Sequence, residues 1–472
     1  MINHLPDEVI LEIFDSYRRG TGQRWRETHD WIYLAQVCRK WRAIVFGSSF
    51  RLDLGITVGP VKPGHIKTIL SYHLPIFINC RNIWGDITAS ALWRMRSALK
   101  HAGGVREIAF SGTSNNFDRI FKETKCAFPN LETLHLDFGR GRQKLLNPEL
   151  LDFFLGPDLS NPHLRRLRLC GVSLAFISGF LLSATSLTGV TLRISTSFAP
   201  SFERFFLAHF QGLTCLRSLD LTVVPRLPHF ESEPPSQPSA PKGVPLSKLT
   251  YFRYFGPSGF LNALVAGVSA SSLRNVRIQF DGAIRPPIMH LPQFINEIQK
   301  TYHAVHVDFK FRKYVFRLTL LTRPEYVSHC NPRLILDSRN CSPESIIQMS
   351  AALSVKLTTV EYLHVNFDST PAVVWENSML WRRFYQQFPS VKVLRTEGAN
   401  NTFRLARTLP QDYGEPLDLA FLPTLKEIDL GKKPLTYRGQ WDDYPLSTFQ
   451  KFVSARRQEG RPVKVFFQCI LD

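Results

Sequence analysis

The sequence predicts an α/β protein in which a short N-terminal helical domain precedes a curved, repeat-built parallel sheet with helical or irregular returns. Two patterns predict this fold: apolar residues at helical spacing within the first 50 residues, and a short strand-like motif that recurs after residue 100. The composition agrees, because 44% hydrophobic and 21% charged residues are typical of a globular chain. A chain of 472 residues can bury a core without disulfides or metals.

Two helices are expected at the N-terminus, over LPDEVILEIFDSYRR and WIYLAQVCRKWRAIVFGSS. Pro6 suits a first helical position, where no backbone N–H is needed. Val9 and Ile13 lie on a broad apolar face of the first helix. Val37 and Trp41 lie on an apolar face of the second helix. Two helices this short cannot bury all of that surface against each other, so part of it should contact another protein.

The same residues resemble the F-box. The pattern LPDEV-I-EIF followed by V-C-R-K-W, with RLDL at 51–54, is most similar to F-box proteins of mushroom-forming fungi. The resemblance implies a non-catalytic substrate-recognition subunit of a Skp–cullin–F-box ubiquitin ligase, docked on the Skp-type adaptor and, through it, on cullin. The stretch 18–30 departs from the family, since it is longer and more basic than the usual connection. An ordinary amphipathic helix pair is the alternative. The resemblance assigns adaptor contacts to Leu5, Pro6, Val9, Ile10, Ile13, Val37, Cys38 and Trp41.

Three parts of the chain follow from these patterns. Residues 1–54 form the F-box-like helical domain, residues 55–104 a connecting segment or atypical first repeat, and residues 105–472 the repeat array. Within the connecting segment, LPIFINC at 74–80 predicts a strand and ASALWRMRSALKHA at 89–102 predicts a basic helix.

One motif, apolar-x-x-apolar-x-apolar, builds the array. Its spacing in the twenties to thirties is the signature of leucine-rich repeats, in which each unit adds one strand to a parallel sheet. The regular asparagine of standard repeats is missing, so we expect an irregular array; a conventional α/β sheet is the alternative. VFRLTL at 315 predicts a hairpin with 302–311, and PRLILDS at 332–338 predicts a degenerate repeat. The motif starts at residues 105, 131, 164, 187, 216, 249, 273, 302, 360, 391 and 425.

Helices are expected in the returns between strands, and a closing strand is expected at the end of the array. Residues 223–248 hold a proline-rich insertion, which we interpret as a loop tolerated between two repeats; a docking segment for a proline-reading module is the alternative. The predicted helices lie within 201–212, 260–268, 291–302 and 342–355, and the closing strand lies within 461–472.

Sequence motifs for catalysis or metal binding are missing. GxGxxG, GxxxxGKS and HExxH do not occur, and no two of the eight cysteines have the spacing of a zinc or redox pair. Acidic residues interrupt the first segment where a secretory signal would be apolar. We therefore expect reduced thiols, a location in the cytoplasm and/or nucleus, no cofactor, no metal and no membrane contact.

The formal net charge of +19 fits either nucleic acid or another polyanion as partner, or else solubility or a surface complementary to an acidic partner, and composition alone does not separate the two. In each strand motif the third, fifth and seventh positions should share the concave face of the sheet. Between 164 and 279 these positions include five arginines and a tyrosine, with Asp220 the one acid, whereas Glu107 and Asp429 lie on either side. Such a row suits an acidic or phosphorylated peptide, and a solvated face is the alternative. The substrate-binding residues expected there are Arg166, Arg168, Arg193, Tyr251, Arg253 and Arg277.

Two functional hypotheses follow. The first is the ligase subunit implied by the F-box resemblance, with an unknown, acidic or phosphorylated protein substrate on the repeats. The alternative is a non-enzymatic basic repeat scaffold that binds nucleic acid or an acidic or phosphorylated protein. Salt dependence separates them, because polyanion binding weakens steeply with salt and apolar docking does not.

Overall fold

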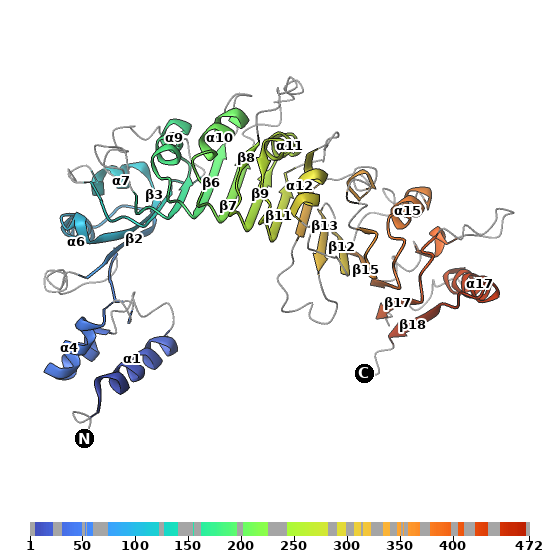
Figure 1. Ribbon diagram of the computed structural model, residues 1–472, viewed down its shortest axis with the longest axis horizontal. Coiled ribbons are helices and arrows are strands. Elements are labelled where there is room, and N and C mark those ends of the chain that lie inside the picture. The colour runs from blue at the N-terminus through green and yellow to red at the C-terminus, as the bar shows by residue number, and fades with distance from the viewer. Residues whose placement is uncertain are drawn as a thin grey trace. The chain divides into compact units, whose positions relative to one another are not determined.

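The computed structural model of the chain is shown in Figure 1. The chain divides into two units. Unit 1 comprises Met1–Ile194 and Gly212–Leu216, and unit 2 comprises Ser195–Gln211 and Arg217–Asp472. The residues that the structure describes are 5–21, 31–49, 52, 54–59, 74–121, 127–139, 154, 162–195, 202–224, 243–281, 290–298, 306–312, 315–321, 334–339, 347–350, 353, 357–368, 378–397, 405–409, 421–432 and 444–468.

The N-terminal domain contains the helices α1 (Asp7–Thr21), α3 (Trp31–Val37) and α4 (Arg39–Gly47). The second helical pattern of the sequence is therefore not one helix, because the chain breaks at Cys38. Cys38 has an extended backbone (φ −158°, ψ 172°), and its Sγ accepts a hydrogen bond from the backbone N–H of Trp41 at 3.4 Å. The thiol thus caps α4 in the way that Ser or Asp caps most helices.

A small apolar core holds these helices together. The rings of Phe14 and Trp41 meet edge to face with centroids 4.9 Å apart, which joins α1 to α4. Lys40 Nζ donates to the carbonyl oxygen of Leu5 at 2.8 Å and lies 3.2 Å from the Asp7 carboxylate, so it anchors the start of α1. The buried apolar residues of the three helices are Ile10, Phe14, Trp31, Ala35, Ile44 and Val45.

The described strands of unit 1 form a parallel sheet in which each strand pairs with the next one along the chain. Parallel neighbours need a crossover after every strand, which is how repeats stack. The strand predicted at 74–80 and the basic helix predicted at 89–102 are confirmed as β2 and α6. The strands are β1 (Ile56–Val58), β2 (Ile76–Ile83), β3 (Val105–Gly112), β4 (Thr133–Asp137), β5 (Arg166–Cys170) and β6 (Gly189–Ser195); the helices are α6 (Ala89–Leu99), α7 (Ser114–Phe121) and α9 (Leu174–Ser183), with a 3₁₀ turn at Ala102–Gly104.

Side chains along β5 show the two faces of this sheet. Leu167 and Leu169 are buried, whereas Arg166 and Arg168 are exposed. Because side chains alternate along a strand, one face packs into the core and the other faces solvent. We call the solvent side the open face of the unit.

Stacked phenylalanines fill the core of unit 1. Phe117 on α7 lies with its ring centroid 4.5 Å from that of Phe121 and 5.1 Å from that of Phe110 on β3. Phe154 continues the stack, 5.9 Å from Phe121 and 6.2 Å from Phe180 on α9. Tilted and edge-to-face pairs at these distances add to the free energy gained from burying the rings alone.

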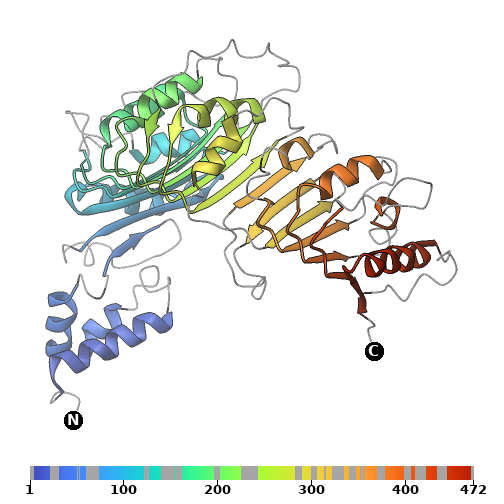
Figure 2. The same ribbon diagram turned by 45° about the vertical axis from the view of Figure 1, so that its right-hand side comes forward.

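The sheet of unit 2 is mostly parallel, and helices α10, α11 and α12 pack side by side in its first half. Figure 2 shows α15 and α17, in orange and red, on one side of the strands that precede the C-terminus. A separate two-stranded sheet joins β8 (Val244–Pro245) to β10 (Val268–Ser269). In spatial order the main strands are β7 (Ser218–Val224), β9 (Tyr251–Gly256), β11 (Asn275–Phe280), β14 (Leu334–Arg339), β13 (Val315–Leu321), β12 (His306–Arg312), β15 (Tyr362–Asp368), β16 (Val393–Glu397), β17 (Glu427–Lys432) and β18 (Lys464–Gln468); the helices are α10 (Phe202–Phe210), α11 (Ser258–Ala266), α12 (His290–Ile298), α15 (Ser378–Tyr385) and α17 (Tyr444–Gln458).

A hairpin interrupts the parallel order of unit 2. Strand β13 pairs antiparallel with β12 on one side and with β14 on the other. The hairpin predicted from the motif at 315 is confirmed, and the degenerate repeat at 332–338 supplies β14. The three strands lie in the sheet in the reverse of their order along the chain, because β14 pairs with β11 and β12 pairs with β15.

Several predicted segments can be compared with the structure. The helices expected within 201–212, 260–268 and 291–302 are confirmed as α10, α11 and α12, and β18 is the closing strand. Of the helix expected over 342–355, residues 347–350 are helical and most of the others lie outside the described residues. The greater part of the proline-rich insertion, 225–242, also lies outside them.

A buried arginine ties the last helix to the sheet. Arg456 of α17 is 2% exposed, and its Nη2 donates to the carbonyl oxygens of Leu422, Pro423 and Leu425 at 3.1, 3.3 and 3.5 Å. Burial lowers the pKa of this guanidinium. The arginine therefore fixes the turn that leads into β17.

Replacing Arg456 with Met should lower the free energy of unfolding of unit 2 by about 3 kcal/mol, because three carbonyls lose a charged donor. Urea denaturation monitored by circular dichroism measures this change. Arg457→Met on the exposed side of the same helix is the matched control and should change stability little. Equal losses in the two variants would show that the carbonyl contacts do not matter.

Candidate functional site

Apolar side chains remain exposed on the N-terminal domain in two stripes. On α1, Val9, Ile13 and Tyr17 follow one another at intervals of four residues and are 44%, 46% and 46% exposed. Residues four apart share a helix face, so these three form a row, the α1 stripe. On α3, Tyr33 and Val37 are 66% and 59% exposed and form the α3 stripe. Exposed apolar clusters of this kind mark protein–protein contact sites.

Charges stabilise α1 without involving its stripe. Asp7 and Glu8 lie in the first turn and Arg18 and Arg19 in the last, which matches the helix dipole. Arg19 also lies 3.3 Å from the carboxylate of Glu12, and Arg18 lies 3.3 Å from that of Asp15. The helix is therefore held by its own charges and by its buried side, and its apolar stripe is available to a partner.

Four of the residues expected to contact the adaptor are accessible. Pro6, Val9, Ile13 and Val37 are exposed. Leu5 is half-buried, and its carbonyl is the acceptor of the Lys40 hydrogen bond. These positions lie at the first two turns of α1 and at the end of α3.

Ile10 is not accessible, and its assignment as an adaptor contact does not agree with the structure. Its side chain is 0% exposed, since successive helical residues point about 100° apart and Ile10 faces the core while Val9 faces solvent. Trp41 and Cys38 are half-buried, and each has an internal role: Trp41 packs on Phe14, and Cys38 caps α4.

Two aromatic residues of the stripes were not among the expected contacts. Tyr17 lies four residues after Ile13, and Tyr33 lies four residues before Val37. That spacing is the signal that could have identified them, because tyrosine presents apolar surface together with a hydroxyl and is enriched in protein interfaces.

Three of the expected substrate-binding arginines lie on the open face of unit 1. Arg166 and Arg168 on β5 are exposed, and Arg193 on β6 is half-buried. The register places Arg168 opposite His135 of β4, and Arg193 opposite Cys170 of β5. Among the described residues, none forms an ion pair with these three arginines. Their positive charge is therefore available to an acidic ligand.

A neutral histidine lies beside this charge. Burial, together with the positive charges of Arg168 and Arg81, lowers the pKa of His135 to about 4, although Asp137 acts in the opposite direction. Asp137 is also engaged in the turn after β4, where its Oδ1 accepts a hydrogen bond from the N–H of Gly139 at 2.8 Å. The open face of unit 1 thus keeps a net positive charge near neutral pH.

The low pKa of His135 makes unit 1 less stable in acid. Between the unfolded pKa of about 6.5 and the folded pKa of about 4, the unfolded chain binds the extra proton, so stability falls as the pH falls through this window. Thermal denaturation from pH 7 to pH 4.5 measures the effect. His135→Asn should flatten that part of the profile; profiles of the same slope in both proteins would contradict the assignment.

The other three expected residues lie on the side of β9 and β11 that alternates with the buried side chains of Phe252, Tyr254, Val276 and Ile278, and we call this side the open face of unit 2. Arg253 on β9 lies 3.5 Å from the carboxylate of Asp220 on β7, so its charge is partly balanced. Arg277 on β11 is opposite Arg253. Tyr251 lies on β9, two residues before Arg253. The single row expected from the sequence is therefore divided, with three residues in each unit.

Metal-ligand clusters and reactive thiols are the usual marks of an enzyme site. In the part of the chain that the structure describes, no three His, Cys, Asp or Glu side chains gather as metal ligands. No described helix is both long and apolar enough to cross a bilayer. None of the four described cysteines forms a disulfide bond with another described residue. Burial raises the pKa of Cys80, and it raises that of Cys170 to about 12, so neither thiol is a thiolate at neutral pH.

The solved structures to which this chain is similar include chains of two complexes. One is a chain of the TLR13–ssRNA13 complex, with 12% sequence identity and a TM-score of 0.28; the match covers 84% of this chain and 48% of that one, so this chain spans about half its length. The other is a chain of the Rad7–Elc1 complex in yeast, with 12% identity and a TM-score of 0.26, covering 84% of this chain and 91% of that one. No curated protein sequence matches.

Comparison with protein families identifies the N-terminal domain. The F-box-like family matches residues 2–51, which include α1, α3, α4 and both apolar stripes. The match agrees with the motif LPDEV-I-EIF and V-C-R-K-W. Residues 2–51 are an F-box-like domain.

Proposed function

We propose that this chain is the substrate-recognition subunit of a Skp–cullin–F-box ubiquitin ligase, acting in the cytoplasm and/or nucleus. The F-box-like domain docks a Skp-type adaptor, which joins it to cullin, and the repeats, of an irregular leucine-rich type as in fungal F-box proteins, hold a protein substrate. The observation that carries the proposal is the pair of exposed apolar stripes on a domain that matches the F-box-like family.

The chemistry of docking follows from the α1 stripe. Val9, Ile13 and Tyr17 are each about half-exposed, so a partner that covers them removes apolar surface from water, which is favourable in proportion to the area buried. A few such side chains in the centre of an interface provide most of its binding energy. Because the contact is apolar, its affinity should depend little on salt.

The repeats supply a different kind of contact. Arg166 and Arg168 are exposed on the open face of unit 1 and can each bind a carboxylate or phosphate through two N–H groups. A substrate held there would be presented to a conjugating enzyme recruited by the ligase. The chain contributes proximity, and the bond-forming chemistry belongs to the other subunits.

A pull-down of the whole chain with a recombinant Skp-type adaptor tests the proposal. We expect binding that is nearly the same at about 0.05 M and about 0.5 M salt, because apolar contacts are insensitive to screening. Binding that disappears at high salt would favour the alternative, a basic scaffold for a polyanion, whose affinity falls steeply with salt. No binding at either salt concentration would refute the docking role.

A further inference from the structure

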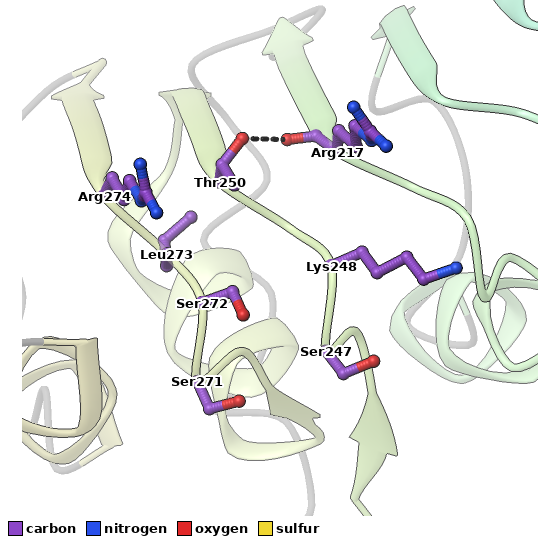
Figure 3. A pocket seen from close by; sticks show the side chains of 8 residues that line it. All are labelled: Arg217, Ser247, Lys248, Thr250, Ser271, Ser272, Leu273 and Arg274. Atoms are coloured by element: carbon purple, nitrogen blue, oxygen red, sulfur yellow. Dashed lines mark hydrogen bonds between the residues drawn. The ribbon is translucent and has the colours of Figure 1, made fainter.

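A basic hollow lies at the amino ends of three neighbouring strands of unit 2. Its volume is about 490 Å³, and it lies where the chain enters β7, β9 and β11 (Figure 3). Arg217 directly precedes β7, Arg274 directly precedes β11, and Lys248 lies on the segment that enters β9. All three cations are exposed.

The positions of the two arginines suit a compact ligand. Neighbouring strands are about 4.8 Å apart, so the backbones of Arg217 and Arg274 are separated by roughly 10 Å with Thr250 between them. Figure 3 shows Thr250 in this central place. Two arginine side chains are long enough to close on one small anion above the middle strand. Among the described residues that line the hollow, none is acidic.

The backbone around the hollow is fixed before any ligand binds. The N–H groups of Thr250 and Tyr251 both donate to the carbonyl of Arg217, and the N–H groups of Arg274 and Asn275 both donate to the carbonyl of Thr250. Thr250 Oγ1 adds a hydrogen bond of 3.1 Å to the same Arg217 carbonyl. The cations are therefore carried by three cross-linked segments, which lowers the entropy lost when they converge.

Hydroxyl groups complete the lining. Ser271 and Ser272 form the turn between β10 and β11, and Figure 3 shows their oxygens directed toward the segment of Lys248. The two-stranded sheet of β8 and β10 joins these segments, with the N–H of Leu246 donating to the carbonyl of Ser269 at 2.8 Å. Hydroxyls beside guanidinium and ammonium groups offer neutral and charged donors to one oxyanion.

We propose that this hollow binds a phosphate monoester dianion. The two guanidinium groups of Arg217 and Arg274 match the charge of one dianion, and their forked donors match tetrahedral phosphate oxygens. The phosphate can come from a small phosphorylated metabolite or from a phosphoserine of a protein partner, and both present the same group. The site is independent of adaptor docking, since it lies in unit 2 and the F-box-like domain lies in unit 1.

Isothermal titration of the full chain with inorganic phosphate, free phosphoserine and a phosphoserine peptide tests the site. We expect saturable binding, and Arg217→Gln with Arg274→Gln should raise the Kd at least about tenfold. Lys248→Gln alone serves as a second variant if the double variant unfolds. A peptide that binds much more tightly than free phosphoserine would identify a protein as the source, and equal affinities would identify a small molecule.

A control variant that loses the same charge elsewhere tests whether phosphate binds in the hollow or responds to the overall positive charge of the chain. Arg165→Gln with Lys426→Gln removes two cations that directly precede β5 and β17, outside the hollow. This control should keep the wild-type Kd for phosphate. Equal weakening in both double variants, or no saturable binding of any of the three probes, would overturn the proposal.

Discussion

Replacing Ile13 with Glu is expected to weaken binding of a Skp-type adaptor at least about a hundredfold. Ile13 is the middle member of the α1 stripe and is 46% exposed, so its side chain would lie near the centre of an interface formed on α1. A carboxylate buried there without a partner loses its hydration and gains nothing in return.

The fold should tolerate this change, because Ile13 is half-exposed in the free domain and a glutamate there can place its carboxylate in solvent. Ile13 is therefore a sharper test than Trp41, whose ring packs on Phe14 at 4.9 Å and whose loss would disturb the domain itself. Surface plasmon resonance with immobilised adaptor gives the change in Kd, and circular dichroism verifies that the helices remain.

Leu182→Glu is the matched control. Leu182 on α9 is 63% exposed and lies outside the F-box-like domain, so the same type of substitution should leave adaptor binding unchanged. Adaptor binding by Ile13→Glu at the wild-type level would show that the α1 stripe is not the docking surface.

The periodicity of the sequence was sufficient to predict most strands of the main sheet and the helices α6, α10, α11 and α12, whereas α7, α9, α15 and α17 were not predicted. The LxxLxL motif marks alternate buried positions, and Leu167 and Leu169 of β5 show why: a strand in a covered sheet must place apolar side chains on one face. The same alternation identified Arg166 and Arg168 as solvent-facing. In β5 the sequence pattern alone therefore identifies which side chains are buried and which face solvent.

Other features depend on contacts that a local pattern does not contain. The break at Cys38 follows from a thiol acting as helix cap, which its residue type does not favour. Ile10 and Val9 are both apolar, and only the packing of α1 decides that Ile10 is buried. The hairpin of β12 and β13 was predicted from the motif at 315, but the pairing of β14 with β11 and of β12 with β15 is long-range and is not specified by the motifs.

The sequence likewise predicted only part of the candidate sites. The arginines of the open face were identified from strand alternation, but their division between two units was not, because the units are set by packing across repeats. The basic hollow was missed because Arg217 and Arg274 precede their strands, outside the positions that alternation assigns to a face.

Reversing the charge of Arg166 and Arg168 to Glu is expected to weaken binding of acidic peptides to the full chain by about tenfold or more. Two exposed cations become two anions on the open face of unit 1, so attraction is replaced by repulsion. Fluorescence anisotropy with a panel of acidic and serine-phosphorylated peptides measures the change, and adaptor binding, which uses α1 and α3, should stay intact.

Arg253→Glu with Arg277→Glu makes the same change in charge on unit 2 and distinguishes the two faces. Arg253 already lies 3.5 Å from Asp220, so less of its charge is available to a ligand, whereas the described residues offer Arg166 and Arg168 no ion pair. The unit 1 variant should therefore lose more affinity than the unit 2 variant. Equal losses would mean that peptides respond to the net charge of the chain, and unchanged binding by the unit 1 variant would mean that its open face is only solvated.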